Sequence, residues 1–329
     1  MSNTSIAENL ANAEDKAAGD NTAKNLVAYK AVLAWTLKTT CKEFSDFNVD
    51  FIAENCIGDV SISEKAVHQD HPDREKKLDG DEKVTAMNSE SSSKNEGSVY
   101  FDLRFRARVP GKDGDIFLIL NIEVQNDDDT PYALVTRGIY YSARMISEQY
   151  GTVFKKSNYQ KIQKVYSIWI CPAPAEKKAG SILQYRIVEK EVMGKSFINE
   201  DDYDKMEVVV IGVGEGCDYS DRSITGLFSV LFSSKMELEE KKRILGGTYG
   251  IAMTKKFESE VEKMGGIGRA YEEAGRIEGL NEGLIQGQLR TLNNLIKNGK
   301  LSIEDAAESA NMTVEEFQKK KEEYKIESL

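Results

Sequence analysis

The sequence contains few of the side chains on which most hydrolytic sites depend. It has two histidines, His68 and His71, both in a polar stretch that we predict to be a flexible insertion. This shortage disfavours histidine-dependent nucleases, serine or cysteine triads and zinc hydrolases. The cysteines are also sparse and lack CxxC spacing, which indicates reduced, packed thiols and neither a zinc site nor a disulfide framework. They are Cys41, Cys56, Cys171 and Cys217.

Long hydrophobic runs are also missing. No stretch approaches the roughly 20 apolar residues of a membrane span, and the polar N-terminal residues lack the apolar core of a signal peptide. We therefore expect a cytoplasmic protein without a membrane partner. The apolar and charged fractions, 40% and 30%, are those of an ordinary globular protein.

The formal net charge of −11 argues against strong non-specific binding to nucleic acid. Most of the acidic excess, however, lies in residues 1–24, 68–96 and 257–329, outside the part of the chain expected to form the core. The remaining body is close to neutral, so a local basic groove can still bind phosphates.

The most regular segment, residues 99–125, is typical of two amphipathic strands joined by a tight turn. Apolar and polar residues alternate over 99–109, and over 116–124 every second residue from Ile116 is apolar, with Asn121 and Glu123 on the opposite face. A side-chain period of two is the signature of a β-strand with one buried face. The glycines on either side of Lys112 and Asp113 predict a hairpin centred between these two residues, so that paired residue numbers sum to 225.

This register places Asp102 directly opposite Glu123, with Gln125 two residues further along the same face. Like charges directly opposite each other are destabilising. A hard divalent cation offsets the repulsion, because Mg²⁺ prefers carboxylate oxygens and keeps water molecules for chemistry. The alternative, which the hairpin alone favours, is that Asp102 belongs to a solvated stripe beside Arg104 and Arg106.

The remaining sequence predicts helices and strands around this hairpin. We expect a disordered tail at 1–23, an α/β domain at 24–256 with a flexible insertion at 67–97, and a helical region at 257–329. The domain reads as a helix, the hairpin, a helix, three strands and two helices. These elements are predicted at 25–44, 99–125, 131–150, 165–172, 182–190, 206–213, 222–233 and 237–246.

The helical region has a stripe of glycines at every fourth position. Each glycine costs a helix about 1 kcal/mol relative to alanine. The stripe therefore indicates either close helix–helix approach, in a homodimer through residues 270–290, or a weakly helical linker. Beyond it, Ser302 and Thr313 are helix-start signals, and the short helices that follow favour a protein-contact bundle over a DNA-reading motif. The glycines are Gly275, Gly279, Gly283 and Gly287.

Several short motifs occur together in the order found in a known family. They are NEGSVYFDLRFRARVPG, NIEVQ, VTRGIYYSARMIS, QKVYSIWIC and EEKKRILGGTYGIAMTK. Together they resemble the Rpn group of recombination-promoting nucleases or transposases, a branch of the PD-(D/E)XK nuclease superfamily, over roughly residues 25–260. The resemblance implies an α/β restriction-endonuclease-like core, a mixed central sheet flanked by helices, followed here by a helical C-terminal appendage.

The resemblance also implies a set of catalytic residues. The motif aspartate is Asp102 and the (D/E)XK strand supplies Glu123, and these two side chains are the implied metal ligands. Gln125, the third catalytic position, stands where the superfamily usually has lysine, so it can orient a water molecule but brings no positive charge. The acid of the first helix is expected to be Glu43, with Glu54 as a weaker candidate.

Arg137, in the helix after the core strand, is expected either to bind the substrate phosphate or to form a salt bridge with the carboxylates. The implied activity is a Mg²⁺-dependent DNA endonuclease, with Mn²⁺ as an alternative metal. A catalytically degenerate member that binds DNA or a protein is the second interpretation. A pure interaction protein built on the glycine-striped tail is the third.

Overall fold

The computed structural model describes residues 18–62, 90–93, 97–111, 114–125, 130–214 and 216–326. Both histidines and the two central residues of the predicted hairpin turn lie outside these ranges. The chain divides into two compact units, Met1–Gly268 and Arg269–Leu329. Within the described residues, no helix has the length and apolar character needed to cross a membrane.

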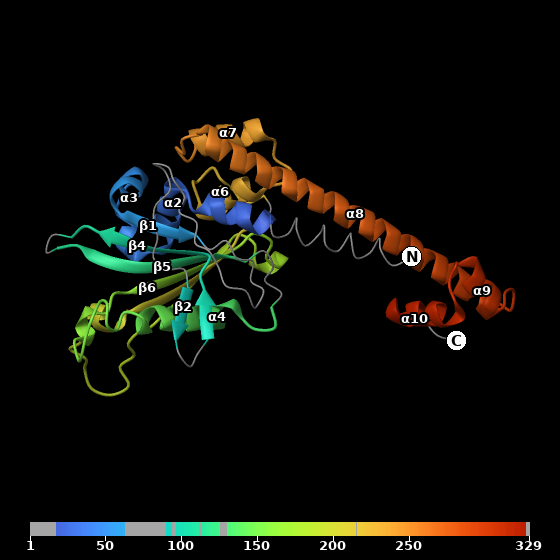
Figure 1. Cartoon of the computed structure of the whole chain (residues 1–329), viewed down its shortest axis with the longest axis horizontal. Helices are drawn as coiled ribbons and strands as arrows, with labels where there is room; N and C mark the ends of the chain where they lie inside the picture. The colour runs from blue at the N-terminus through green and yellow to red at the C-terminus, as the bar shows by residue number, and fades with distance from the viewer. Residues whose placement is uncertain are drawn as a thin grey trace. The chain divides into compact units, whose positions relative to one another are not determined.

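The first unit is built on a mixed sheet of six strands (Figure 1). The order across the sheet is β1-β4-β5-β6-β8-β7, in which β5, β6 and β8 are parallel and the other neighbours are antiparallel. The predicted α/β sheet flanked by helices is thus confirmed. The strands are β1 (Ile57–Ile62), β4 (Leu103–Val109), β5 (Ile116–Val124), β6 (Val165–Cys171), β7 (Ser181–Arg186) and β8 (Met206–Gly212), and a separate pair is formed by β2 (Glu90–Ser93) and β3 (Gly97–Tyr100).

The predicted hairpin register is confirmed. Strands β4 and β5 pair from Leu103 with Ile122 to Val109 with Ile116, so that every pair of residue numbers sums to 225. The alternation of apolar and polar side chains leaves little choice of register, because a slip of one residue would turn the apolar face of a strand away from the core.

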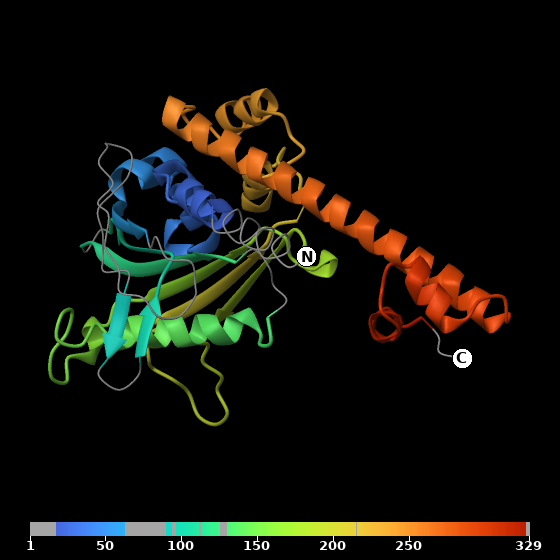
Figure 2. The ribbon, with the colours of Figure 1, turned by 45° about the vertical axis from the view of Figure 1, so that its right-hand side comes forward.

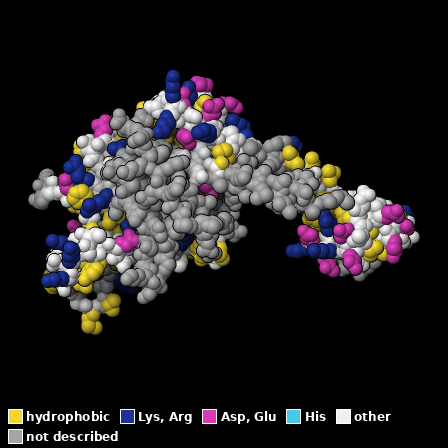
Figure 3. All heavy atoms as spheres, in the orientation of Figure 1, with side chains coloured by type: hydrophobic (Ala, Val, Ile, Leu, Met, Phe, Trp, Pro, Cys, Tyr) yellow, Lys and Arg dark blue, Asp and Glu magenta, His cyan; other side chains and the backbone are white. Residues whose placement is uncertain are grey.

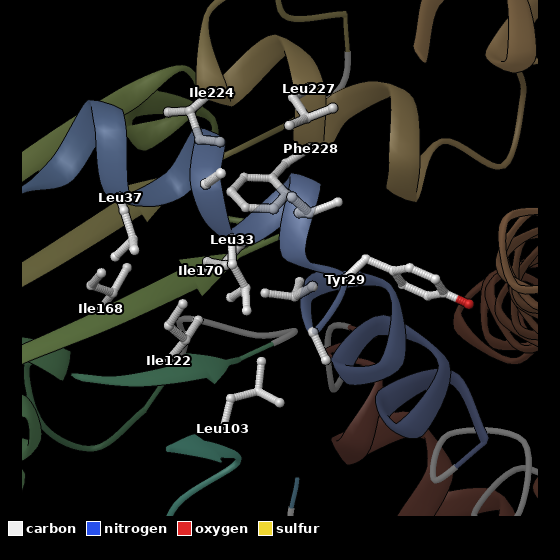
Figure 4. Close-up of a cluster of buried hydrophobic side chains, with 14 of the residues drawn as sticks. Tyr29, Leu33, Leu37, Leu103, Ile122, Ile168, Ile170, Ile224, Leu227 and Phe228 are labelled. Atoms are coloured by element: carbon white, nitrogen blue, oxygen red, sulfur yellow. The ribbon is translucent and has the colours of Figure 1, made fainter. Parts of the chain in front are cut away.

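Helices cover both faces of the sheet. Leucines and isoleucines of β4, β5 and β6 pack against α2 and α6 on one face, and Figure 4 shows their side chains meeting Leu33, Leu37 and Phe228. On the other face lies α4, the green helix beneath the sheet in Figure 2. It packs against Ile119, Trp169 and Val208. The helices of this unit are α2 (Lys30–Thr40), η1 (Lys42–Phe44), α3 (Val49–Asn55), α4 (Leu134–Ser147), η2 (Tyr159–Lys161), η3 (Glu176–Lys178), α5 (Glu200–Tyr203), α6 (Ile224–Phe232) and α7 (Leu238–Gly247).

The N-terminal boundary differs from the sequence prediction. Residues 18–27 are helical and precede a break at Ala28 and Tyr29, so part of the stretch predicted as a disordered tail is folded. The reason is burial, since the side chains of Ala23, Leu26 and Val27 are fully enclosed in the core of the first unit. In the predicted insertion, residues 90–93 form a strand, and residues 67–89 lie outside the described ranges.

The second unit is helical. The long helix α8 (Lys255–Lys297) contains the unit boundary, and α9 (Ile303–Ser309) and α10 (Val314–Glu323) follow. Leu289, Ala306 and Phe317 form its small core. Both predicted helix starts are confirmed, because the side chains of Ser302 and Thr313 cap α9 and α10. Figure 3 shows basic and acidic side chains interspersed on the visible, described surface of this unit.

Candidate active site

Two carboxylates meet at the end of the β4–β5 ladder. Asp102 directly precedes β4, and Glu123 is the penultimate residue of β5, one step beyond the Leu103–Ile122 pair. Each carboxylate binds the backbone beside the other: Asp102 N–H donates to Glu123 Oε1 at 3.1 Å, and Val124 N–H donates to Asp102 Oδ2 at 3.1 Å. The predicted cross-strand pair is therefore present, and both side chains are held by backbone donors.

Both carboxylates are buried, with 6% of Asp102 and 3% of Glu123 exposed. Burial raises the pKa of Glu123 well above its usual range, and the negative charge of Asp102 raises it further. Two ionised carboxylates are costly in this position unless cations accompany them. The solvated stripe considered as the alternative from the sequence does not describe this environment.

One cation is supplied from the N-terminal helix. Lys24, in the helical residues 18–27, places Nζ at 2.7 Å from Asp102 Oδ1, and Lys24 itself is only 3% exposed. Our sequence interpretation missed Lys24, because it began the first helix at residue 25. The available signal was the apolar set Ala23, Leu26 and Val27, whose helical spacing begins before that residue.

Asn121 is a second residue that the sequence interpretation missed as part of the site. Its side-chain amide donates to Glu123 Oε1 at 3.1 Å, so Oε1 accepts two hydrogen bonds. Asn121 lies two residues before Glu123 on the same face of β5, which is the spacing that could have indicated it. Its oxygen has no hydrogen-bond partner within the described residues, and the same holds for the hydroxyl of the fully buried Ser142 on α4.

Arg137 extends from α4 on the face of the sheet toward which Glu123 points. Its Nε and Nη2 atoms donate to the Tyr141 hydroxyl at 3.2 and 2.7 Å, and its guanidinium lies 5.1 Å from the ring centres of both Tyr141 and Trp169. Within the described residues it forms no ion pair with Asp102 or Glu123 at 4.0 Å or less. Its positive charge nevertheless lowers the pKa of Glu123.

Tyr141 fills a structural position beside this arginine. Burial, together with the charge of Glu123, raises the pKa of Tyr141 to about 12. The phenol is therefore protonated at neutral pH, as expected for a packing residue and not for a general base. Its ring contacts Phe101 and Trp169 and so forms part of the platform beneath Arg137.

Gln125 follows directly after β5 and is half-buried. Its backbone N–H donates to the carbonyl of Ile170 at 2.9 Å, which extends the parallel pairing of β5 and β6 by one residue. This pairing places the backbone of Gln125 at the same end of the sheet as Glu123. The side chain is neutral, so it adds no positive charge to the carboxylate pair.

Glu43 does not join the pair, contrary to our expectation. It lies in η1, where Oε2 accepts a hydrogen bond from the Tyr166 hydroxyl at 2.7 Å and Oε1 lies 3.3 Å from Lys164 Nζ. Tyr166 pairs with Leu120 whereas Glu123 pairs with Trp169, three residues further along β6. Tyr166 and Trp169 also belong to the cores on opposite faces of the sheet.

Glu43, in the turn after α2, therefore lies near the start of β6 and on the face of the sheet opposite to Glu123. This position excludes a direct role for Glu43 beside Asp102. There it shares Lys164 with two further carboxylates, Asp204 at 2.8 Å and Glu207 at 3.2 Å. Glu54, the weaker candidate, is exposed on α3. Among the described residues, no group of three or more histidine, cysteine, aspartate or glutamate side chains is arranged to hold a metal ion.

The Asp102–Glu123 pair nevertheless fits a hard divalent cation. Mg²⁺ commonly uses one or two protein carboxylates and fills its other positions with water and substrate phosphates. Each carboxylate oxygen has two lone pairs, and Glu123 Oε2 accepts no hydrogen bond from the described residues. The like charge of the pair is the feature that a cation would relieve.

Residues 81–211 match the family model described as PD-(D/E)XK nuclease family transposase. No curated protein and no solved structure matches the chain. The matched range contains Asp102, Glu123, Gln125 and Arg137, whereas Lys24 and Glu43 lie before it. Residues 81–211, within the α/β unit, are therefore similar to the PD-(D/E)XK nuclease family, and this similarity suggests a function of the nuclease type.

Proposed function

We propose that the protein is a Mg²⁺-dependent DNA endonuclease that hydrolyses phosphodiester bonds at Asp102 and Glu123. The observation that carries this proposal is the buried pair of carboxylates, each held by the backbone next to the other, in a domain of this family. Bound between them, Mg²⁺, or Mn²⁺ in its place, would supply charge neutralisation and a water molecule of lowered pKa.

In this reaction the oxygen of a water molecule bonds to phosphorus and the bond from phosphorus to a sugar oxygen breaks. The water gives up a proton, and the departing sugar oxygen takes up a proton. Asn121 holds the carboxylate of Glu123 in place through its 3.1 Å hydrogen bond. Gln125 has an amide that can orient the water molecule.

We assign phosphate binding to Arg137. Its guanidinium carries five N–H donors in a planar fork that suits phosphate oxygens. The rings of Tyr141 and Trp169 and the hydrogen bonds from Arg137 to the Tyr141 hydroxyl hold the group on the Glu123 side of the sheet. This arrangement supports the first of the two roles considered for Arg137 from the sequence.

Nicking of supercoiled plasmid tests the proposed function. We expect wild-type protein to nick in Mg²⁺ or Mn²⁺ and not in a chelator, and Asp102→Ala to lose this activity. Asp115→Asn is a matched control, because Asp115 lies on the same hairpin but is exposed and paired with Arg108. Equal nicking by wild type and Asp102→Ala would reject the proposal.

A catalytically degenerate DNA-binding protein is the second candidate function. The neutral Gln125 and the ion pair that already occupies Asp102 Oδ1 favour it. It predicts no metal-dependent nicking by the wild type, together with retained binding of DNA that Arg137→Ala weakens. A gel-shift titration beside the plasmid assay separates the two functions.

A further inference from the structure

We propose that Lys24 provides the positive charge of this active site and orients the attacking water. Gln125 cannot provide that charge, because its side chain is neutral. The inference rests on the proposed nuclease function and extends it to a residue outside the part of the chain matched by the family model. It starts from the 2.7 Å contact between Lys24 Nζ and Asp102 Oδ1.

Packing of the neighbouring residues holds Lys24 in place. The neighbouring side chains of Ala23, Leu26 and Val27 are fully buried in the core, so the helical residues 18–27 are anchored on both sides of the lysine. With 3% of Lys24 exposed, its ammonium group is largely removed from bulk water. A charge in such an environment acts more strongly on its neighbours than a charge at the surface.

Stability alone is a weak explanation for this ion pair. Removing two charges from water costs free energy that offsets most of their attraction, so a buried pair stabilises a fold little compared with apolar residues of similar size. Because Asp102 is itself a carboxylate of the proposed site, the charge of Lys24 acts directly on the chemistry there.

The charge also matches what the hydrolysis requires. Negative charge increases on the phosphate oxygens as the water attacks, and fixed positive groups in a site shielded from solvent stabilise that charge. Arg137 lies on the Glu123 side of the pair and Lys24 contacts Asp102, so the two carboxylates have one basic group each. The geometry thus assigns Lys24 to water and Arg137 to phosphate.

A competing interpretation is that Lys24 is only a counter-ion, which neutralises Asp102 and must be displaced by the metal. The two interpretations predict opposite effects of removing its charge. A counter-ion that competes with the metal slows the reaction, so removing the charge of Lys24 would leave the nicking rate unchanged or increase it. A group that orients water is needed for the chemical step, so its removal would lower kcat.

The experiment compares Lys24→Gln, the double variant Lys24→Gln/Gln125→Lys, and Lys30→Gln as a partly exposed control on α2. We expect Lys24→Gln to lower kcat of plasmid nicking by about 100-fold or more, the scale of losing one fixed group that stabilises a transition state, while KM for plasmid changes little. Calorimetry without DNA should show Mn²⁺ binding at least as tight as in wild type. The double variant should recover most of the lost kcat.

Nicking by Lys24→Gln at or above the wild-type rate would overturn the role of Lys24 and leave the proposed function intact. A loss of kcat that Gln125→Lys does not restore would also overturn it. Wild-type nicking no faster than that of Asp102→Ala would overturn the proposed function, and this inference with it.

Circular dichroism will show whether Lys24→Gln folds. If Lys24→Gln does not fold, Lys24→Arg tests the role of Lys24, because arginine keeps the ion pair with Asp102 but changes the position of the N–H donors. We expect this variant to fold and to lose at least about tenfold in kcat, a free-energy change of about 1.4 kcal/mol in the barrier. An unchanged kcat in a folded Lys24→Arg variant would show that Lys24 is only structural.

Discussion

The Tyr166 hydroxyl donates a hydrogen bond to Glu43 at 2.7 Å, and Tyr166 packs on the face of the sheet opposite to the one toward which Glu123 points. This contact, together with the approach of Lys164, gives Glu43 a structural position. The first-helix acid expected from the family resemblance is therefore absent from the carboxylate pair, and the N-terminal helix presents a lysine there instead.

We predict that Glu43→Gln leaves nicking within about threefold of wild type, because the amide lies away from the reacting groups and can still accept the Tyr166 hydrogen bond. Loss of one charged partner of the buried Lys164 should lower the free energy of unfolding by about 1–3 kcal/mol. Urea unfolding measures the stability and plasmid nicking measures the activity. A folded Glu43→Gln variant without nicking activity would return Glu43 to the catalytic set.

Glu123→Gln should make the metal-free protein more stable at alkaline pH. The pKa of Glu123 is raised in the folded state, so between its ordinary value and that raised value the folded protein binds more protons than the unfolded protein. Wild-type stability therefore falls as the pH rises through this window. Glutamine removes this dependence, and its oxygen can still accept the hydrogen bonds from Asp102 and Asn121.

Differential scanning calorimetry without divalent cations tests this expectation. The melting temperature of Glu123→Gln should exceed that of wild type at pH 8, and the difference should shrink toward pH 5. Mn²⁺ should then raise the melting temperature of the wild type but not of the variant. A difference that does not change with pH would contradict the predicted titration of Glu123.

Gly138→Ala should disturb the packing of α4 on the sheet. A Cβ atom at this position would clash with the side chain of Val208 and would lie 2.9 Å from Trp169 Nε1. Both neighbours are buried, so we expect a loss of about 1–3 kcal/mol in the free energy of unfolding. Arg137 rests on Trp169, so nicking should fall as well.

Gly266→Ala, in the part of α8 that belongs to the first unit, is the matched control for this substitution. A Cβ there meets no described atom within 4 Å, so alanine should leave stability unchanged or raise it by up to about 1 kcal/mol through its helix propensity. Thermal unfolding of both variants checks the comparison. Equal stability of Gly138→Ala and wild type would contradict the close packing of α4.

The glycine stripe of α8 leads to a prediction about assembly. A Cβ at Gly279, Gly283 or Gly287 would meet none of the described atoms within 4 Å, so no contact among the described residues requires these glycines. The homodimer through residues 270–290 remains our prediction for them. We expect wild type to sediment as a dimer and Gly283→Leu to shift toward monomer, because the larger side chain separates the two helices.

Sedimentation velocity at several concentrations measures this shift. Gly266→Leu, in the part of α8 that belongs to the first unit, is the control, because a Cβ there also meets nothing within 4 Å in the part of the chain that the structure describes. A monomeric wild type, or the same distribution for wild type and Gly283→Leu, would exclude the predicted homodimer through this stripe.

Local sequence patterns were sufficient to predict the hairpin and its register. The alternation of side chains and the short turn specify which residues of β4 and β5 face each other, and this brought Asp102 opposite Glu123. The caps at Ser302 and Thr313 were equally predictable, because each capping bond joins residues only three positions apart.

The remaining geometry depends on contacts between distant segments. Strand β7 pairs with the outer side of β8, the first helix starts before residue 25, Lys24 reaches Asp102, and Glu43 lies beside Lys164. Side-chain periodicity shows which face of an element is buried, but it does not show which element covers that face. For Lys24 and Glu43, packing of the N-terminal helices on the sheet decided which of the two lies at the carboxylate pair.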